Sequence, residues 1–172
     1  MQPLDNLTLE VIAMSISPAV ERFVKAHGVE YEVIQHPAAF TAMEEAAAAH
    51  VSGQEWAKTV VVLTPEGEAI QAVLPASFSV DLGRLEKLVR AGALRLAEEK
   101  EFVGLYPDCE LGAMPPLGNL YHQKVFVDRA LAADETIVFD AGDHQSALRM
   151  RYADYEKLVS PIVGEFGRAV GA

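Results

Sequence analysis

The sequence predicts a mixed α/β fold of the α+β type, in which helices surround a mixed β-sheet. Two observations predict it. About six short segments rich in β-branched residues are interspersed with four or five segments of helical periodicity. These segments do not follow the regular strand–helix–strand repeat of a doubly wound sheet. A chain of 172 residues with 51% hydrophobic and 23% charged residues also fits one globular domain.

The first predicted helix covers residues 17–28. Ser17 is its expected N-cap, Pro18 occupies the first helical position, and Gly28 ends it. Residues 29–34 then alternate between apolar and polar side chains, as a half-buried strand does.

A second helix is predicted over residues 42–51, because Thr41 and Glu44 form a T-x-x-E capping box before it. Two apolar stretches, residues 58–64 and 69–75, follow and are separated by the turn sequence PEGE. This spacing predicts a β-hairpin.

The rest of the chain predicts shorter elements of the same two kinds. The expected helices are residues 79–92, 98–106 and 152–159, and the expected strands are residues 94–97, 124–128, 136–140 and 147–150. No internal repeat or linker divides the chain. We therefore predict an N-terminal extension at residues 1–14 and a single domain at residues 15–172.

The charge of the chain limits its partners. Fourteen basic and 25 acidic residues give a net charge of −11, which argues against DNA binding and against non-specific contact along a nucleic-acid backbone. Binding at one end of a nucleic acid remains open. Five basic residues form either a solvated helix face or such a contact: Arg84, Lys87, Arg90, Arg95 and Lys100.

The location and cofactor content follow from what the sequence lacks. Cys109 is the only cysteine, no apolar run reaches the roughly 18 to 20 residues of a membrane helix, and the N-terminus lacks a basic signal-peptide start. These features predict a cytoplasmic protein without membrane contact. The five histidines show no paired ligand spacing, so we expect no metal and no cofactor.

The stretch ELGAMPPLGN, residues 110–119, has two consecutive prolines between two glycines. Proline restricts its own backbone and that of the preceding residue, so Met114–Pro116 should be a stiff extended segment. Gly112 and Gly118 at its ends allow close backbone approach. The stretch is either a rigid surface turn or a pre-shaped rim that presents the amides of Leu117–Asn119 to a ligand.

Two further residues are candidates for chemistry. Lys58 opens an apolar strand, where it either reaches solvent or points into a cleft to hold a phosphate or a polarised carbonyl. His144 follows Gly142 in a tight connection between two strands, and it is either a turn residue or a catalytic one.

Four stretches together resemble the YbaK/prolyl-tRNA-synthetase-associated domain family of aminoacyl-tRNA editing domains. They are HPAAFTAMEEAAAAHVSGQEWAKTVVV, FVGLYPDCELGAMPPLGN, VFVDRAL and VFDAGDHQSALRMRYADYEKLV. No synthetase catalytic domain accompanies them, so the chain looks like the free-standing form. The resemblance implies a β-sheet of about six or seven strands curled toward a barrel and surrounded by helices.

The resemblance also implies a hydrolase that cleaves the ester of a mischarged tRNA, commonly tRNA for proline, without a cofactor. Its expected partners are the acceptor end of that tRNA and prolyl-tRNA synthetase. The implied catalytic residues are Lys58, Gly118 and His144, and the implied substrate-binding residues are Thr41, Gly112, Met114, Pro115, Pro116, Leu117, Asn119 and Gly142. Met114 stands where the cysteine-specific branch tends to carry serine, so the resemblance assigns no cysteinyl substrate.

A mechanism follows from the two readings together. Ester hydrolysis passes through an oxyanion, which pre-aimed amides of the proline stretch and the charge of Lys58 would stabilise while water or a substrate group attacks. Two alternatives are a non-catalytic module that binds aminoacyl-tRNA, an amino acid or a nucleotide, and a hydrolase of small esters or thioesters.

Overall fold

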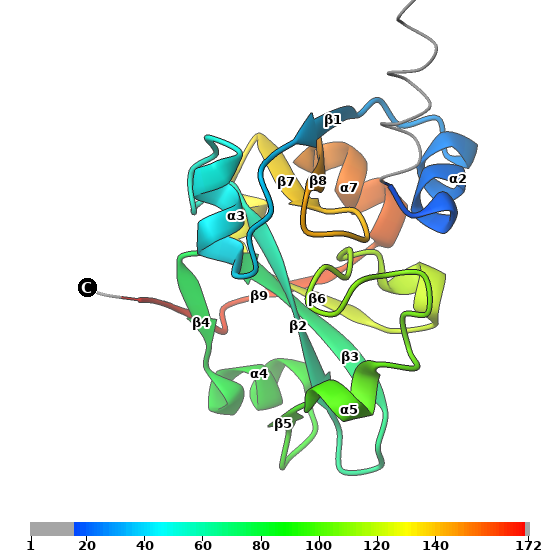
Figure 1. Ribbon diagram of the computed structural model, residues 1–172. Helices are drawn as coiled ribbons and strands as arrows, with labels where there is room; N and C mark the ends of the chain where they lie inside the picture. The colour runs from blue at the N-terminus through cyan, green and yellow to red at the C-terminus, as the bar shows by residue number, and fades with distance from the viewer. Residues whose placement is uncertain (1–15, 171–172) are drawn as a thin grey trace, which may run out of the picture.

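The computed structural model describes residues 16–170, which form three β-sheets with helices around them (Figure 1). The helices are α2 (Pro18–Ala26), α3 (Ala42–Ala48), α4 (Leu82–Val89), α5 (Glu99–Phe102), α6 (Arg129–Ala132) and α7 (Tyr152–Val159), with the 3₁₀ helix η1 (Gly118–Tyr121). The strands are β1 (Glu32–Gln35), β2 (Ala57–Leu63), β3 (Ala69–Pro75), β4 (Phe78–Val80), β5 (Arg95–Leu96), β6 (Val125–Asp128), β7 (Thr136–Asp140), β8 (Ser146–Arg151), β9 (Ile162–Gly164) and β10 (Gly167–Ala169). The predicted extension at residues 1–14 lies outside the described residues.

The largest sheet has five strands in the order β5-β2-β3-β6-β9. β2 pairs antiparallel with β3 and β5, whereas β3–β6 and β6–β9 are parallel. The predicted hairpin of β2 and β3 and the mixed sheet are therefore confirmed. β1-β8-β7 form a separate antiparallel sheet, and β10-β4 form a third.

The structure does not confirm the expected curled, barrel-like sheet of six or seven strands. The described strands divide among three sheets, and no closed barrel forms among them. A single parallel bridge, between Trp56 just before β2 and Val138 on β7, joins the two larger sheets. One bridge does not continue a ladder, and the space between the two sheets is filled by side chains instead.

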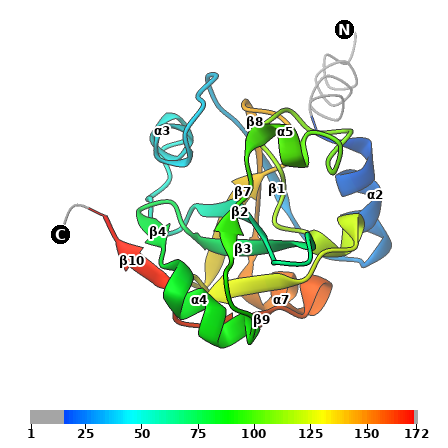
Figure 2. The ribbon, with the colours of Figure 1, turned by 90° about the horizontal axis from the view of Figure 1, so that it is seen from below.

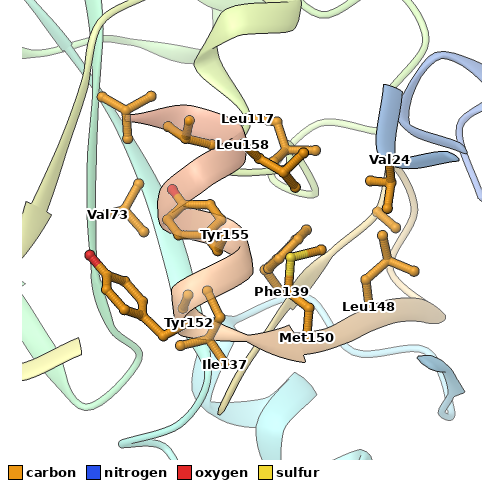
Figure 3. Close-up of a cluster of buried hydrophobic side chains, with 14 of the residues drawn as sticks. Val24, Val73, Leu117, Ile137, Phe139, Leu148, Met150, Tyr152, Tyr155 and Leu158 are labelled. Atoms are coloured by element: carbon orange, nitrogen blue, oxygen red, sulfur yellow. The ribbon is translucent and has the colours of Figure 1, made fainter. Parts of the chain in front are cut away.

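The main hydrophobic core lies between these two sheets and around α7 (Figure 3). Phe139 on β7, Tyr155 on α7 and Leu117 before η1 are fully buried in it. A second core lies on the other side of the central hairpin, under α4. Figure 2 shows α4 beside β9. The Leu88 side chain of α4 packs closely against Gly164, and a Cβ added to Gly164 would lie 2.6 Å from Cδ2 of Leu88.

Local signals placed most helix starts correctly. The Ser17 hydroxyl accepts from the Val20 amide, and the Thr41 hydroxyl accepts from the Glu44 amide at 3.1 Å. The helix predicted over residues 79–92 is shorter, because residues 79 and 80 belong to β4 and Asp81 is the actual N-cap of α4. Capping by a side chain thus fixes where α2, α3 and α4 begin.

Several elements were not predicted. β4, β9 and β10 have three residues each, and α6 has four, so their periodicity is too short to recognise. β1 begins three residues later than expected and α5 ends at Phe102, before Gly104. Among residues 16–170, none of the helices has the length and apolar character that crossing a bilayer requires.

Asp128, at the end of β6, holds the C-terminal strands in place. Its carboxylate is 3% exposed and accepts from the amides of Ala130 at 2.9 Å, Phe166 at 2.9 Å and Gly167 at 2.7 Å. We expect Asp128→Ala to destabilise the fold by about 3 kcal/mol, because the amides of Phe166 and Gly167 lose their acceptor. Urea unfolding measures this change. Glu165→Ala is the control, because that side chain is 65% exposed and should change stability by less than about 1 kcal/mol.

Candidate functional site

The central part of the proline stretch is buried, while residues 110–112 and Asn119 are exposed. Residues 113–118 are all buried, and both proline carbonyls have partners within the fold. The Gln71 side chain donates to the Pro115 carbonyl at 3.2 Å, and the Tyr155 hydroxyl donates to the Pro116 carbonyl at 2.7 Å. These bonds fix the segment from both sides, so the stiffness expected from the prolines is reinforced by tertiary contacts.

The turn after the prolines is packed without space for a side chain. A Cβ on Gly118 would lie 2.5 Å from the Gln123 carbonyl oxygen and 2.5 Å from the Val125 side chain. Within residues 16–170, the amides of Leu117, Gly118 and Asn119 donate no hydrogen bond. The chain thus keeps three successive donors in a fixed backbone, of which Leu117 and Gly118 are buried and Asn119 is exposed.

The start of the proline stretch pairs with the connection between β7 and β8. The Glu110 amide donates to the Gly142 carbonyl at 2.7 Å, and the Gly142 amide donates to the Ala113 carbonyl at 3.2 Å. Gly112 lies against the His144 ring, because a Cβ built on Gly112 would lie 3.3 Å from the Cε1 atom of His144. The structure therefore brings Gly112 to Gly142 and His144, although Gly112 lies about 30 residues before them in the sequence.

His144 is held at both ring nitrogens. Nδ1 lies 2.7 Å from the Glu45 carboxylate on α3, and Nε2 lies 2.7 Å from the Leu111 carbonyl. Burial alone lowers the pKa of His144, but the bonds to Glu45 and Leu111 outweigh it and the net pKa is raised. With both ring nitrogens engaged, the imidazole links α3 to the loop that precedes the prolines.

Lys58 is half-buried at the start of β2. Its nearest described acceptor is the Ala76 carbonyl at 3.5 Å, and no carboxylate of residues 16–170 forms an ion pair with it. Burial lowers the pKa of the Lys58 ammonium. A desolvated cation without a counterion in an acidic protein is typical of a site that binds an anionic or polarised ligand.

Lys58 and the proline stretch lie on different faces of the hairpin. Side chains alternate along β2, and Ala57 packs in the same core cluster as Leu117. On the other face, Val62 and Leu74 pack under α4, and Leu74 is the register partner of Lys58. The Lys58 ammonium and the amides after the prolines therefore lie on opposite faces of the hairpin, and no described contact joins them.

The other predicted residues make contacts within the fold. Thr41 is exposed and caps α3, and the side-chain amide of Asn119 donates to the Leu158 carbonyl at 3.0 Å. Met114 is buried, and its sulfur accepts from the Gly112 amide at 3.3 Å. The exposed Phe40 ring lies 5.2 Å from the His144 ring, which brings the segment before Thr41 to the same region.

A buried polar cluster beside His144 was missed. Glu45 on α3, Asp140 at the end of β7 and His36 after β1 are 1%, 8% and 6% exposed. Burial first, and then the neighbouring Glu45 carboxyl, raise the pKa of the Asp140 carboxyl. In sequence Glu45 belongs to an acidic first helical turn, which usually faces solvent, and no local signal indicated its burial. These groups are the described residues that could hold a cation.

The basic residues between positions 84 and 100 are partly neutralised. Arg95 pairs with Glu101 at 2.6 Å, and Lys100 lies 3.3 Å from Glu98. In the described chain Lys87 and Arg90 form no ion pair. The surface left for a nucleic-acid phosphate is therefore smaller than the sequence suggested.

Cys109 is partly buried and its thiol lies 3.4 Å from the Tyr121 hydroxyl. Burial is the main cause that raises the pKa of Cys109 to about 12. Since the thiolate is the reactive form, we expect slow labelling of the native protein by a disulfide reagent at pH 8 and rapid labelling after denaturation. Equal rates in the two states would show that the thiol is available as a nucleophile.

Comparisons with known proteins agree with this architecture. The chain resembles the structure of the hypothetical protein APE2540, with 24% identity over 87% of this chain and 99% of that one, and a TM-score of 0.78. It also resembles a proposed trans-editing enzyme for prolyl-tRNA synthetase, with 23% identity over 90% and 100% of the two chains and a TM-score of 0.77. A proposed signal transduction protein from Marinobacter aquaeolei VT8 has 17% identity, covers 87% of this chain and 30% of that one, and gives a TM-score of 0.70.

These likenesses show the fold, and no curated protein sequence matches the chain significantly. The family model for the aminoacyl-tRNA editing domain matches residues 36–158, which is more than half of the chain. That range contains Lys58, the proline stretch and His144. The chain therefore belongs to the aminoacyl-tRNA editing domain family.

Proposed function

We propose that this protein hydrolyses the ester of a mischarged tRNA in trans, with tRNA for proline as its substrate. The observation that carries the proposal is Lys58, a half-buried cation without a carboxylate partner in the described chain, within the editing-domain match. The acceptor end of a charged tRNA offers the two groups that such a cation binds, a phosphate and an ester carbonyl. The similar structure of a proposed prolyl-tRNA synthetase trans-editing enzyme supports proline tRNA.

In the proposed reaction, water adds to the ester carbonyl and forms a tetrahedral oxyanion. The acyl C–O bond then breaks, the ribose oxygen takes up the proton that the water gives up, and the products are a free amino acid and the tRNA hydroxyl. The Lys58 ammonium is the proposed source of positive charge at the oxyanion, and the amides of Leu117–Asn119, on the other face of the hairpin, are the proposed donors to another group of the acceptor end. Rigid donors require little reorganisation during the reaction, and a single one is typically worth about 10²- to 10³-fold in rate.

Neither His144 nor Cys109 is available as a base for the attacking water. Both nitrogens of His144 are engaged, and Cys109 keeps its proton at neutral pH. The free hydroxyl of the terminal ribose, next to the ester, is the remaining group that can orient the water. The reaction then requires the ribose hydroxyl of the substrate, and a small ester without that hydroxyl should react slowly.

The engaged ring nitrogens of His144 favour a second candidate function. A site with donors for an oxyanion but without a free base can bind an aminoacyl-tRNA and not hydrolyse it. The two functions are distinguished by turnover and not by affinity.

The test is single-turnover deacylation of proline tRNA charged with alanine, serine, cysteine or threonine, with an equally charged unrelated tRNA as the control. Rapid loss of one aminoacyl group from proline tRNA would support the proposal and identify the substrate. Equal rates on both tRNAs would contradict proline specificity. Tight binding without hydrolysis across the panel would favour the binding function.

A further inference from the structure

Three buried side chains from separate segments meet beside α3. His36 follows β1, Glu45 belongs to α3, and Asp140 ends β7. Each offers one ligand atom, and these three atoms lie within 4.8 Å of one another. Because no side chain of the three is more than 8% exposed, the cluster is part of the interior and not an acidic surface.

The tautomer of His36 leaves a lone pair inside this cluster. Its Nδ1 atom lies 2.8 Å from the Pro37 carbonyl, which can only accept a hydrogen bond, so Nδ1 carries the proton. In the neutral ring Nε2 is then an acceptor, and it is buried without a hydrogen-bond partner in residues 16–170. An Nδ1–H bound to a backbone carbonyl is the arrangement that orients histidine for metal binding through Nε2.

The two carboxylates also direct unpaired oxygens inward. Glu45 uses Oε1 to hold His144 at 2.7 Å, while its Oε2 has no partner among the described residues. Asp140 Oδ1 is likewise buried without a partner in that part of the chain. Buried polar atoms are normally bonded, so three such atoms without a partner at one point indicate either a proton shared by the carboxyls or a missing cation.

The local charge is negative. Glu110 accepts from the His144 amide at 3.4 Å, and Asp143 lies close enough to act on Asp140. His144 Nδ1 faces Glu45, and no lysine or arginine in the described chain forms an ion pair with Glu45 or Asp140. A divalent cation would offset this excess of carboxylates.

We propose that His36 Nε2, Glu45 Oε2 and Asp140 Oδ1 bind one divalent transition-metal ion of the Zn²⁺ type. One imidazole and two carboxylates suit such an ion better than Ca²⁺ or Mg²⁺, which favour all-oxygen sites. Metal–ligand bonds of about 2.0 to 2.2 Å place the ligand atoms roughly 3 to 4 Å apart. The three atoms already lie within 4.8 Å of one another, so small side-chain movements would complete the site. Since the ligands are buried, the ion ties α3 and the end of β1 to β7 and does not contact tRNA.

The test uses the full-length protein, stripped with a chelator and titrated calorimetrically with Zn²⁺. We expect one Zn²⁺ per chain and a higher melting temperature. His36→Gln should weaken binding at least tenfold and abolish the thermal shift. His50→Asn is the matched control, because it also removes one imidazole, from an exposed residue whose positive φ asparagine tolerates.

Co²⁺ provides a second measurement if His36→Gln does not fold. Bound to wild type in this mixed site, Co²⁺ should give visible absorption bands that one equivalent of Zn²⁺ removes, and Asp140→Asn should lose them. Failure of wild type to bind one equivalent would overturn the proposal and leave the two carboxyls sharing a proton. Unchanged Zn²⁺ binding in both His36→Gln and Asp140→Asn would also overturn it, because the ion would then sit elsewhere.

Discussion

Lys58→Ala is expected to lower the single-turnover rate of deacylation by about 10²- to 10³-fold. The ammonium is the proposed source of positive charge at the ester, and its nearest described acceptor is only a carbonyl at 3.5 Å. Removing it should leave the fold stable, because no ion pair in the described chain depends on it. The measurement is rapid-quench deacylation of the mischarged tRNA identified by the panel, at saturating enzyme.

Lys87→Ala is the matched control for this variant. Lys87 is a lysine of α4 without an ion pair in the described chain, so its loss changes the net charge equally. If both variants slow the reaction to the same extent, the effect is long-range attraction of tRNA and not chemistry at the ester. Full activity of Lys58→Ala would remove this residue from the site.

The same lysine predicts an alkaline limit to the activity. Burial lowers the Lys58 pKa, so as the pH rises the ammonium loses its charge before an ordinary lysine, whose pKa is about 10.4. The enzymatic rate, corrected for spontaneous ester hydrolysis, should be at its maximum below the lowered pKa of Lys58. It should fall as the pH rises through that pKa. In Lys58→Arg the charge persists, so any activity that remains should not show this fall. An identical alkaline limb in both proteins would assign the titration to another group.

Gly118→Ala is expected to destabilise the protein by about 3 kcal/mol, which lowers the melting temperature by roughly 5 to 10 °C. The added Cβ would lie 2.5 Å from the Gln123 carbonyl oxygen, and a backbone atom cannot move aside as a flexible side chain can. The displaced turn would also misplace the amides of Leu117–Asn119, so activity should fall more than stability requires. Calorimetry and deacylation at a temperature where the variant is folded measure the two effects.

Gly104→Ala provides the comparison at a glycine with open surroundings. No atom lies within 4 Å of a Cβ built at Gly104, so the same substitution should leave stability and activity nearly unchanged. A Gly118→Ala protein as stable and active as Gly104→Ala would show that the turn adapts, and that its rigidity is not part of the site.

Much of the fold could be predicted because its signals are local. The Ser17 and Thr41 caps each bond an amide three residues along the chain, and the β2–β3 hairpin needs only two apolar stretches and a short turn. Three-residue strands such as β4 and β10 have no such signal, because each is stabilised by pairing with the other, nearly 90 residues away in sequence. The division into separate sheets escaped prediction for the same reason.

The candidate site divides in the same way. The proline stretch, the glycines at its ends and Lys58 at a strand start are visible in the sequence, and their order allowed the family resemblance to be recognised. Their surroundings are not visible. Gln71 and Tyr155 hold the prolines from 44 and 39 residues away, and the alternation of β2 decides which face Lys58 occupies.

The sequence by itself therefore determined the local elements, the stiff proline stretch and the membership of the editing-domain family. Only the tertiary structure decided that Glu45 meets His144 across 99 residues and that His36 and Asp140 join them in the interior. The physical reason is the range of the interactions. Caps, turns and periodicity act over a few residues, whereas the burial of a polar side chain depends on which distant segments pack around it.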